Sequence, residues 1–498
     1  MLDIIIQVLP DLLNLKIIIN LVIGVTIGAS FGAIPGLSGI LAVALLLPYT
    51  FTLGLFPSMA LLLGAYKGSM FGGSVSAISF GVPGDSPAAA TVIDGWPLCK
   101  KGKPYRALNA ALYASISGNL VADIVVLVSI IPLSKLSLKF GPRELTVLMV
   151  LAMLSLTLLL GKSISKGIIG VMIGAFMASF GFDPVTAIPR LTFGLRTLMD
   201  GIPLVPFIVG LFAFSEILIQ YGKGVQRNHR AREENTSISS VRKRSPDDNF
   251  TWMDLFKCWR EALIGYVLGV ILGVIPGPGA TMAAFSAHGL AGRLQKNKGK
   301  FGTGMVEGVV AAEAGNSATV GPTLIPLLTF GIPGSGIAAL FGAALILQGM
   351  TPGPGLFTEH MDLIAALFIL MPIGTLINLL VSKIVIIPVF TRLALIEPRI
   401  LTAWLVPLMM VGIYSMNLHS FDVVVFFAAG FFGLILRRIQ VPLAPVVVAM
   451  MVAPLLEVHL RRALILSRGN LVYFIQSPTA MVLYLAIFAL AIYAWRTH

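Results

Sequence analysis

Apolar runs separated by short polar loops cover almost the whole chain. In the first half these runs occupy residues 12–34, 38–53, 58–82, 107–133, 144–160, 167–182 and 202–220. Later runs occupy residues 261–276, 278–292, 305–332, 335–349, 363–390, 400–417, 421–436, 442–456 and 480–496. A helix needs about 20 mostly apolar residues to cross the hydrocarbon core of a bilayer. The pattern therefore predicts an all-α polytopic membrane protein.

Two pairs of matched motifs interrupt these runs. Residues 32–36 read Gly-Ala-Ile-Pro-Gly, and residues 273–277 read Gly-Val-Ile-Pro-Gly, about 241 positions later. Residues 80–84 (Phe-Gly-Val-Pro-Gly) and 330–334 (Phe-Gly-Ile-Pro-Gly) are about 250 apart. Pro-Gly breaks a helix, because proline lacks a backbone donor and glycine accepts unusual φ values. In lipid the freed backbone groups have no water to bind. Matched breaks in two halves are typical of secondary transporters that bind substrate at the breaks.

A third anchor supports an internal duplication. Residues 142–146 (Pro-Arg-Glu-Leu-Thr) resemble residues 398–402 (Pro-Arg-Ile-Leu-Thr), about 256 positions on. The simpler alternative is that Pro-Gly recurs by chance in a chain with 51 Gly and 30 Pro. Three anchors in one order favour duplication. We predict a first transmembrane repeat at 1–222, a polar cytoplasmic linker at 223–250 and a second repeat at 251–498.

Basic residues predict that the two repeats are inverted. The loop after the first motif, residues 52–58, has no charge, and the loop after the second, residues 100–106, is basic. In the second half the basic loop comes first, at residues 293–300, and residues 351–362 contain no Lys or Arg. Basic loops stay in the cytoplasm. Equivalent loops therefore lie on opposite sides of the membrane, as in inverted-repeat transporters.

Two basic loops disagree with this assignment. Residues 135–143 and 461–468 fall on the outer side when the crossings are followed from the linker. They are either interfacial helices or a sign that the number of crossings is wrong.

The first break of the second half is predicted to lie in a re-entrant hairpin. The runs 261–276 and 278–292 have basic residues at both ends and a Pro-Gly-Pro-Gly tip. At about 1.5 Å per residue each arm reaches roughly 20–24 Å, which is short for a full span. The equivalent hairpin around Pro35 would enter from outside. This arrangement indicates an elevator-like transporter with broken helices.

Composition excludes several other classes. Hydrophobic residues make up 57% and charged residues 11% of the chain, against roughly 45–50% and about 25% in soluble domains. The net charge of +13 comes from short loops between apolar runs, so it indicates membrane orientation and no nucleic-acid binding. The two cysteines have no metal-ligand spacing. The first apolar run is interpreted as a retained helix, because no basic region or cleavage site precedes it. No catalytic motif or Walker A sequence is present, so we predict no enzyme activity and no cofactor.

Small and polar residues gather beside the breaks. A helix end that faces a break presents free N–H groups, which suit an anion. The same hydroxyls and amides could instead hold helices together. The predicted substrate-binding residues are Pro35, Gly36, Ser38, Lys67, Gly73, Ser74, Pro83, Gly84, Pro276, Gly277, Asn316, Ser317, Thr319, Pro333, Gly334 and Ser335.

Charged residues inside apolar runs are the more specific signals. Lys67 lies in the middle of a run, where it could attract an anionic substrate. It could equally form a structural pair with Asp85 or Glu313, or extend its charge to the interface. Asp85 and Glu313 are predicted to couple transport to a proton or a sodium ion, although each could be a buried helix–helix hydrogen bond. Asp123 is a weaker candidate.

Several motifs resemble the large membrane subunit of the tripartite tricarboxylate transporters. They are residues 32–36, 68–74 (Gly-Ser-Met-Phe-Gly-Gly-Ser), 94–97 (Asp-Gly-Trp-Pro), 101–102, 106–108, 313–316 (Glu-Ala-Gly-Asn) and 331–334. The resemblance covers nearly the whole chain and implies a multi-pass carrier for carboxylates in the bacterial inner membrane. It implies two protein partners, namely a small four-helix membrane subunit and a periplasmic substrate-binding protein. It also implies import driven by a proton or sodium gradient. The family tends to have an aromatic residue where Lys67 stands.

These observations predict a binding-protein-dependent secondary transporter for a tricarboxylate or dicarboxylate. The alternative is an anion channel or an exporter that needs no binding protein. A channel needs a continuous pore lined by polar groups, whereas the polar residues here cluster at the breaks. A scaffold subunit without transport activity is a third possibility.

Overall fold

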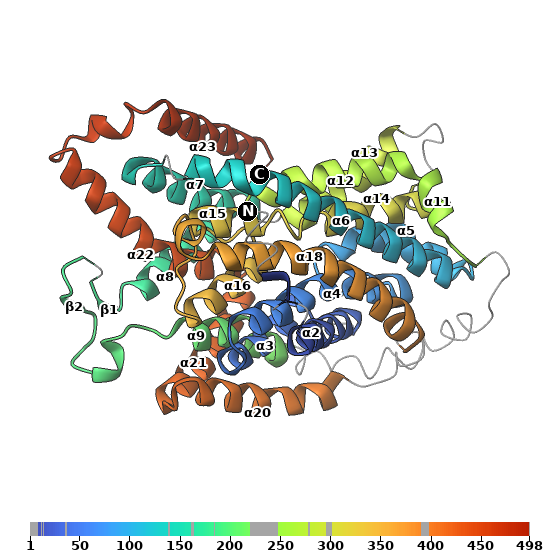
Figure 1. Ribbon diagram of the computed structural model, residues 1–498, viewed down its shortest axis with the longest axis horizontal. Coiled ribbons are helices and arrows are strands. Elements are labelled where there is room, and N and C mark those ends of the chain that lie inside the picture. The colour runs from blue at the N-terminus through green and yellow to red at the C-terminus, as the bar shows by residue number, and fades with distance from the viewer. Residues whose placement is uncertain are drawn as a thin grey trace.

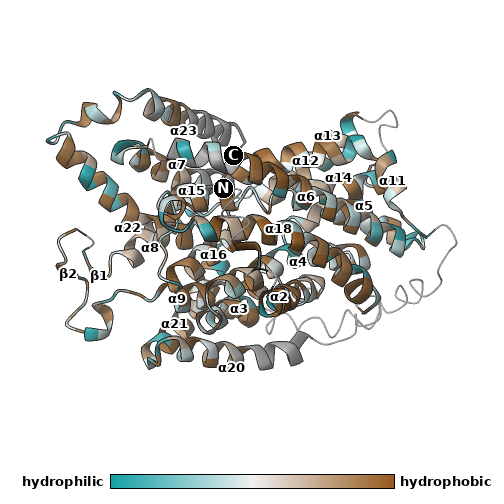
Figure 2. Cartoon of the chain, viewed as in Figure 1, coloured by the Kyte–Doolittle hydropathy of each residue, from teal (hydrophilic) through white to brown (hydrophobic). Residues whose placement is uncertain are grey.

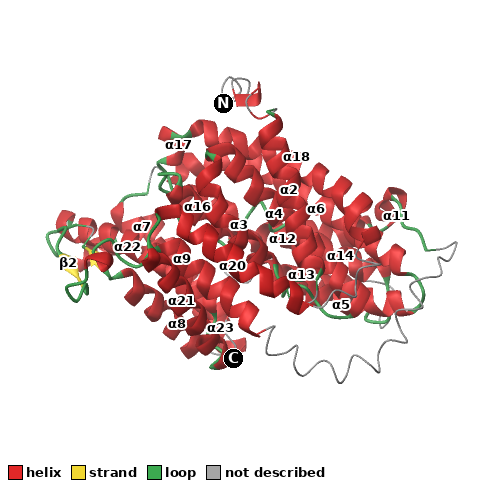
Figure 3. Cartoon of the chain, turned by 90° about the horizontal axis from the view of Figure 1, so that it is seen from below, coloured by secondary structure: helices red, strands yellow, loops and turns green. Residues whose placement is uncertain are grey.

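Among the residues that the structure describes, the fold is helical apart from one short β-hairpin (Figures 1 and 3). The computed structural model describes residues 8–10, 12, 14–34, 37–137, 140–160, 164–183, 185–219, 248–276, 279–294, 301–389 and 398–497. Within these residues, five helices are long and apolar enough to cross a membrane. Hydrophobic residues cover most of the helices (Figure 2). The prediction of an all-α polytopic membrane protein is therefore confirmed.

The elements of the first half run from α2 to η2. Their bounds are α2 (Leu15–Ala33), α3 (Gly39–Leu53), α4 (Leu55–Phe80), α5 (Ala88–Lys100), α6 (Pro104–Ser137), α7 (Pro142–Leu160), α8 (Ile164–Ala178), β1 (Gly181–Phe182), β2 (Pro189–Arg190), η1 (Arg196–Leu198), α9 (Leu204–Val209) and η2 (Gly210–Phe214). The strands are antiparallel, with Gly181 opposite Arg190. The predicted linker lies outside the described residues, except for residues 248–250.

The elements of the second half run from α11 to α23. Their bounds are α11 (Trp252–Lys257), α12 (Trp259–Val274), α13 (Gly279–Leu294), α14 (Val306–Ser317), α15 (Leu324–Phe330), α16 (Gly336–Leu347), α17 (Leu356–Glu359), α18 (Met361–Val381), η4 (Ser382–Ile386), α20 (Pro398–Asn417), α21 (Ser420–Arg438), α22 (Leu443–Leu466), η5 (Leu471–Phe474) and α23 (Pro478–Thr497).

Each predicted Pro-Gly break separates two helices. The first motif of each half lies between α2 and α3 or between α12 and α13. At the second motifs, α4 and α15 end at Gly81 and Gly331, whose φ angles are 65° and 74°. This left-handed conformation favours glycine, which has no Cβ to clash with its own carbonyl. The backbone therefore turns out of the helix at equivalent places in both halves.

Three element boundaries differ from the sequence prediction. The run 305–332 is two helices, because the chain forms turns over residues 318–323, where Pro322 supplies no backbone donor. Helix α5 was missed, because Asp94 and Lys100 interrupt its apolar pattern. Helix α22 continues ten residues past the predicted end at residue 456, because Glu457 and Arg461 pair with each other on adjacent turns.

Glycines bring α2 and α4 into close contact. A Cβ atom at Gly24 would lie 2.0 Å from the carbonyl oxygen of Leu61, and one at Gly28 would lie 2.1 Å from that of Ala65. The order of these contacts shows that the two helices run parallel. No larger residue fits, so the glycines set the distance between the helices.

The same packing recurs between α12 and α14. A Cβ atom at Gly265 would lie 2.9 Å from the carbonyl oxygen of Ala311, and one at Gly269 would lie 2.7 Å from that of Gly315. These glycines follow Gly24 and Gly28 by 241 positions, and their partners follow Leu61 and Ala65 by 250. The matching offsets support the proposal of an internal duplication.

The loops fall into two groups at opposite ends of the fold. Gln348 Nε2 donates to the Thr50 carbonyl at 2.8 Å, which joins the ends of α16 and α3. Asp94 accepts a hydrogen bond from the Gly304 amide at 2.8 Å, which joins α5 to the loop before α14. The chain leads from the first pair into the loops without Lys or Arg and from the second pair into the basic loops. This is the grouping that an inverted repeat requires.

Replacing Gly28 by Ala is expected to destabilise the protein. The added Cβ would collide with the α4 backbone, and overpacking of this kind costs about 1–3 kcal/mol or more. The matched control is Gly289→Ala on the exposed side of α13, where a Cβ meets nothing within 4 Å. Thermal unfolding in detergent should show a lower midpoint for Gly28→Ala and an unchanged or higher midpoint for Gly289→Ala. Equal midpoints would contradict the packing described.

Candidate functional site

The N-termini of α3 and α16 lie side by side. Each begins with a serine cap, because the Ser38 hydroxyl accepts from the Leu41 amide at 3.3 Å and the Ser335 hydroxyl accepts from the Ala338 amide at 3.1 Å. A Cβ atom at Gly336 would lie 3.2 Å from Cδ1 of Ile40. Two predicted residues from different halves, Ser38 and Ser335, are therefore brought together.

Helices α3 and α16 also run parallel, because Thr50 and Gln348 meet at their other ends. The positive ends of both helix dipoles point to the same region. The first N–H groups of a helix have no partner within it. Such an arrangement is suited to binding an anion.

Hydroxyl groups of α4 and of the turn before α15 border these helix ends. Tyr66 Oη and Thr323 Oγ1 are 2.9 Å apart. The Ser69 hydroxyl donates to the Tyr66 carbonyl at 2.9 Å, and a Cβ atom at Gly39 would lie 2.3 Å from Ser69 Oγ. Tyr66, Ser69 and Thr323 are all buried. The region therefore combines helix ends, hydroxyls and glycine, and the carboxyl group of Asp85 is close enough to Tyr66 for electrostatic interaction.

The N-termini of α5 and α13 form a second pair, which is the counterpart of the α3–α16 pair in the predicted repeat. Asp85 Oδ1 accepts from the Ala88 amide at 3.0 Å, so Asp85 caps its helix as Ser335 does 250 positions later. Asp85 packs against Gly73, where a Cβ atom would lie 2.8 Å from Oδ1. Further along, His288 Nε2 and Asp94 Oδ2 are 2.8 Å apart, which links α13 to α5.

Glu313 is the main buried acid of this region. Its Oε1 atom accepts hydrogen bonds from the hydroxyls of Ser74, at 2.5 Å, and Thr91. Its Oε2 atom has no hydrogen-bond partner among the described residues, and neither do the two polar side-chain atoms of Asn316. Glu313, Ser74 and Asn316 are fully buried. The carboxyl group of Asp85 is close enough to Glu313 for electrostatic interaction.

Glu313 forms no ion pair within the described part of the chain. A buried carboxylate without a cation is costly, because it has lost its hydration. Oxygen atoms of carboxylate, amide and hydroxyl groups are suitable ligands for a hard cation. The cluster of Glu313, Asn316, Ser74 and Thr91 can therefore accept a proton or a small cation.

The second break of each half packs directly against backbone of the same half. A Cβ atom at Gly84, after Pro83, would lie 2.2 Å from the carbonyl oxygen of Gly32. A Cβ atom at Gly334, after Pro333, would lie 2.6 Å from the carbonyl oxygen of Thr323. Small residues are needed at these contacts, because backbone passes directly against backbone.

Lys67 lies in a buried ion pair and away from the helix ends. Its Nζ atom is 2.8 Å from Asp123 Oδ1 and 2.8 Å from Thr375 Oγ1, and Lys67 is fully buried. The structural pairing that we considered is present, with Asp123 in place of Asp85 or Glu313. The pair joins α4, α6 and α18.

The remaining predicted residues are distributed around these two clusters. The Ser317 hydroxyl is 2.7 Å from that of Ser115 on α6, and Thr319 Oγ1 donates to the Asn316 carbonyl at 2.6 Å. Pro276 follows the end of α12. Three predicted residues, Pro35, Gly36 and Gly277, lie outside the described residues.

Sequence reasoning missed the partners Thr375 and His288. Thr375 had a detectable signal, since Thr375, Asn378 and Ser382 are polar residues at helical spacing within the apolar run 363–390. Asn378 Nδ2 donates to the Lys67 carbonyl at 3.1 Å. His288 lies opposite Asp94 in the parallel helix, a relation that only the fold reveals.

Comparison with known proteins assigns a family. Residues 18–448 match the model of the "Tripartite tricarboxylate transporter TctA family". An "uncharacterized 52.8 kDa protein in TAR-I ttuC' 3'region" from Agrobacterium vitis is 35% identical over 449 residues, which is 90% of this chain and 87% of that protein. An "uncharacterized protein in TAR-II ttuC' 3'region" from the same organism is 38% identical over 212 residues, which is 43% of this chain and 87% of that protein. No solved structure matches the chain significantly.

The Lys67–Asp123 pair yields a stability prediction. Asp123→Asn should leave Lys67 buried without a counter-charge, and losing one partner of a buried pair costs about 3–5 kcal/mol. The double variant Lys67→Met/Asp123→Leu removes both charges and should recover most of that loss. Thermal unfolding of the two variants and of Lys67→Met tests this. Unfolding of Asp123→Asn at the wild-type temperature would show that the pair contributes nothing.

Proposed function

Because the chain belongs to the tripartite tricarboxylate transporter TctA family, we propose that it is the transport subunit of a binding-protein-dependent secondary transporter. In this proposal it imports a tricarboxylate or dicarboxylate across the bacterial inner membrane, driven by a proton or sodium gradient. Its partners are a small four-helix membrane subunit and a periplasmic binding protein that delivers the substrate.

The observation that carries the proposal is the meeting of the α3 and α16 N-termini. A carboxylate between Ser38 and Ser335 would face two helix dipoles and the hydroxyls beside them. This region lies where broken helices from the two halves meet, which is the usual substrate position in inverted-repeat transporters. A substrate with several carboxylates could use one for the helix ends and leave another for groups from the second half.

The Glu313 cluster is the proposed coupling site. Its carboxylate has one oxygen without a partner, and the neighbouring Asn316 amide has none. A proton or a sodium ion would neutralise this buried charge before the site moves through the membrane. Asp85 adds a second carboxyl group to the same region, so filling the site would also relieve repulsion between the two acids.

Alternating access would come from motion of the helices that carry the breaks. In this proposal α2–α5 and α12–α16 move as one body against the remaining helices, as in elevator-like transporters. The Lys67–Asp123 pair joins α4 to α6, so it would break or carry α6 with it during this motion.

The substrate class and the driving ion can be tested by uptake into proteoliposomes. We expect labelled citrate or another small carboxylate to accumulate only when the complete complex, the binding protein and a sodium or proton gradient are present. Conductance without a gradient would favour an anion channel. No flux with any combination of partners would favour a scaffold subunit.

Replacing Glu313 by Gln should uncouple transport from the ion gradient. A hydrogen-bonded charged ligand contributes about 1.5–3 kcal/mol, so the apparent ion affinity should fall about tenfold or more. The matched control is Glu307→Gln on the same helix, because Glu307 is only partly buried and lies six positions from Glu313. Accumulation and exchange should be measured together. Gradient-driven accumulation by Glu313→Gln at the wild-type level would remove Glu313 from the coupling site.

A further inference from the structure

The loop between α8 and α9, residues 179–183 and 185–203, extends from one end of the fold. It contains the β1–β2 hairpin and lies at the opposite end of the molecule from α5 and α11 (Figure 1). The basic loops that predict the cytoplasmic side belong to the α5 end. The hairpin loop, as we call these residues, is therefore on the predicted outer side.

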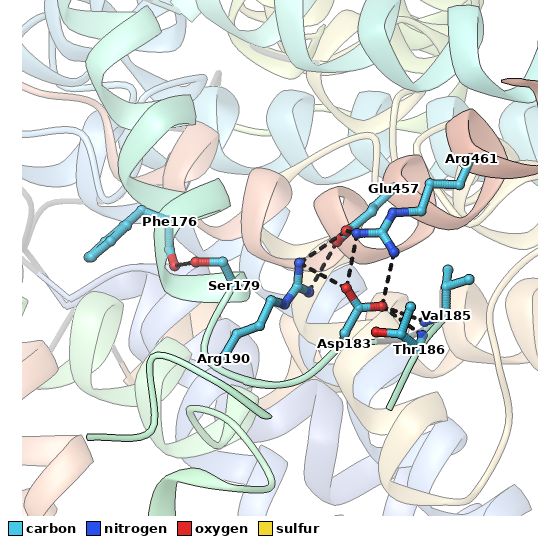
Figure 4. Close-up of polar contacts among 8 residues, drawn as sticks. All are labelled: Phe176, Ser179, Asp183, Val185, Thr186, Arg190, Glu457 and Arg461. Atoms are coloured by element: carbon cyan, nitrogen blue, oxygen red, sulfur yellow. Dashed lines mark hydrogen bonds and ion pairs between the residues drawn. The ribbon is translucent and has the colours of Figure 1, made fainter. Parts of the chain in front are cut away.

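A network of four charges holds the hairpin loop against the end of α22 (Figure 4). Asp183 Oδ2 is 2.9 Å from Arg461 Nη2, and Arg190 Nη1 is 3.0 Å from Glu457 Oε1. Arg190 also lies 3.4 Å from Asp183. The alternating charges satisfy one another, so the two strands are fixed to the helix at several points.

The hairpin loop is also fixed internally. The amides of Thr186 and Val185 donate to Asp183 Oδ1, and these bonds, with Arg461, keep the pKa of Asp183 well below its usual range. Asp183 therefore stays ionised at every pH near neutrality, and the anchor persists. Ala187, Leu191 and Phe193 have φ angles of 56°, 52° and 48°. A non-glycine residue in this conformation costs free energy, so the surrounding contacts impose the shape.

The fixed loop presents apolar side chains to its surroundings. Phe193 is 75% exposed, Ile188 is 61% exposed and Leu195 is 55% exposed. Phe182, Val185 and Leu191 are exposed as well. A cluster of exposed apolar residues on a preformed loop is typical of a protein interaction site.

Exposed arginines lie in the hairpin loop and at the end of α22. Arg196 in the loop, and Arg462 and Arg468 at the end of α22, form no ion pair within the described part of the chain. Lys and Arg residues are usually more frequent in cytoplasmic loops, and residues 135–143 are another basic segment on the predicted outer side. The presence of positive charge on the outer side, beside apolar residues, indicates complementarity to an acidic surface.

The hairpin loop is connected to the proposed substrate region. It leads directly into α9 and η2, and Phe212 of η2 lies 3.6 Å from the position of a Cβ atom at Gly336. Gly336 follows Ser335 at the N-terminus of α16. A contact made on the loop can therefore reach the end of a substrate-binding helix through one continuous segment.

We propose that the hairpin loop and the end of α22 form the docking surface for a soluble protein that has an apolar patch bordered by carboxylates. This inference rests on the proposed function, in which a periplasmic binding protein delivers the substrate. It adds where on this chain that protein binds and which side chains of this chain make the contact.

Binding of the periplasmic protein that supports uptake should be measured with the complete complex in nanodiscs. Phe193→Asp and Arg468→Glu should each weaken binding about tenfold or more, since a buried aromatic or charged contact at an interface can contribute over 1.4 kcal/mol. Higher salt should weaken wild-type binding and have less effect on Arg468→Glu.

Leu418→Asp is the matched control. Leu418 is 70% exposed and has a φ angle of 56°. It precedes α21, so it lies at the opposite end of that helix from Arg437. This variant should bind as the wild type does. Wild-type binding by Phe193→Asp, or equal loss in Leu418→Asp, would overturn the proposal.

Two further measurements separate this proposal from its alternatives. Substrate alone, without the binding protein, should raise the unfolding temperature of the complex by the same amount in all three variants. Loss of this stabilisation would indicate damage to the substrate site, whereas loss of partner binding alone indicates damage to the docking surface. A polarity-sensitive fluorophore on Phe193→Cys, in nanodiscs of phosphatidylethanolamine and phosphatidylglycerol, should report an aqueous environment until the partner is added. An apolar environment without the partner would identify lipid as the occupant and overturn the proposal.

Discussion

Interrupted backbone inside a membrane is the constraint on which this structure depends. Each break frees N–H and C=O groups that lipid cannot satisfy. The protein meets this requirement by packing the broken segments directly against neighbouring backbone. Gly84 lies against the Gly32 carbonyl and Gly334 against the Thr323 carbonyl, while serine and aspartate side chains cap the helices that follow. The N–H groups that remain point to shared regions, where a bound anion would complete their hydrogen bonds.

The two halves share a geometry but differ in charge. Ser335 and Asp85 occupy equivalent cap positions, and Glu313 stands where the first half has the buried Leu63. The pair α3–α16 therefore meets among hydroxyls and helix dipoles, and the pair α5–α13 meets near two carboxyl groups. A few substitutions on a symmetric frame are enough to create one region suited to an anion and another suited to a cation. This division supports the proposed coupling of substrate and ion.

The sequence predicted what depends on local pattern and missed what depends on contacts between distant segments. Apolar runs, Pro-Gly breaks and buried acids were visible, because each follows from neighbouring residues. The turns at residues 318–323 could have been predicted from Pro322, whereas α5 was hidden by Asp94 and Lys100. The pairing of Lys67 with Asp123 required knowledge that α4 crosses α6. Arg461 lies on the predicted outer side, against the usual distribution of positive charge, and only the structure shows that Asp183 and Glu457 neutralise it there.

The central claim, that the first turns of α3 and α16 bind the carboxylate together inside the membrane, can be tested by thiol labelling. Ser38→Cys and Ser335→Cys would each be made in a chain lacking Cys99 and Cys258, with a cysteine at the exposed Asp200 as reference. The account predicts that both react more slowly than the reference with a membrane-impermeant reagent, and that substrate protects both to the same extent. Reaction of both as fast as the reference, with no protection by substrate, would contradict it.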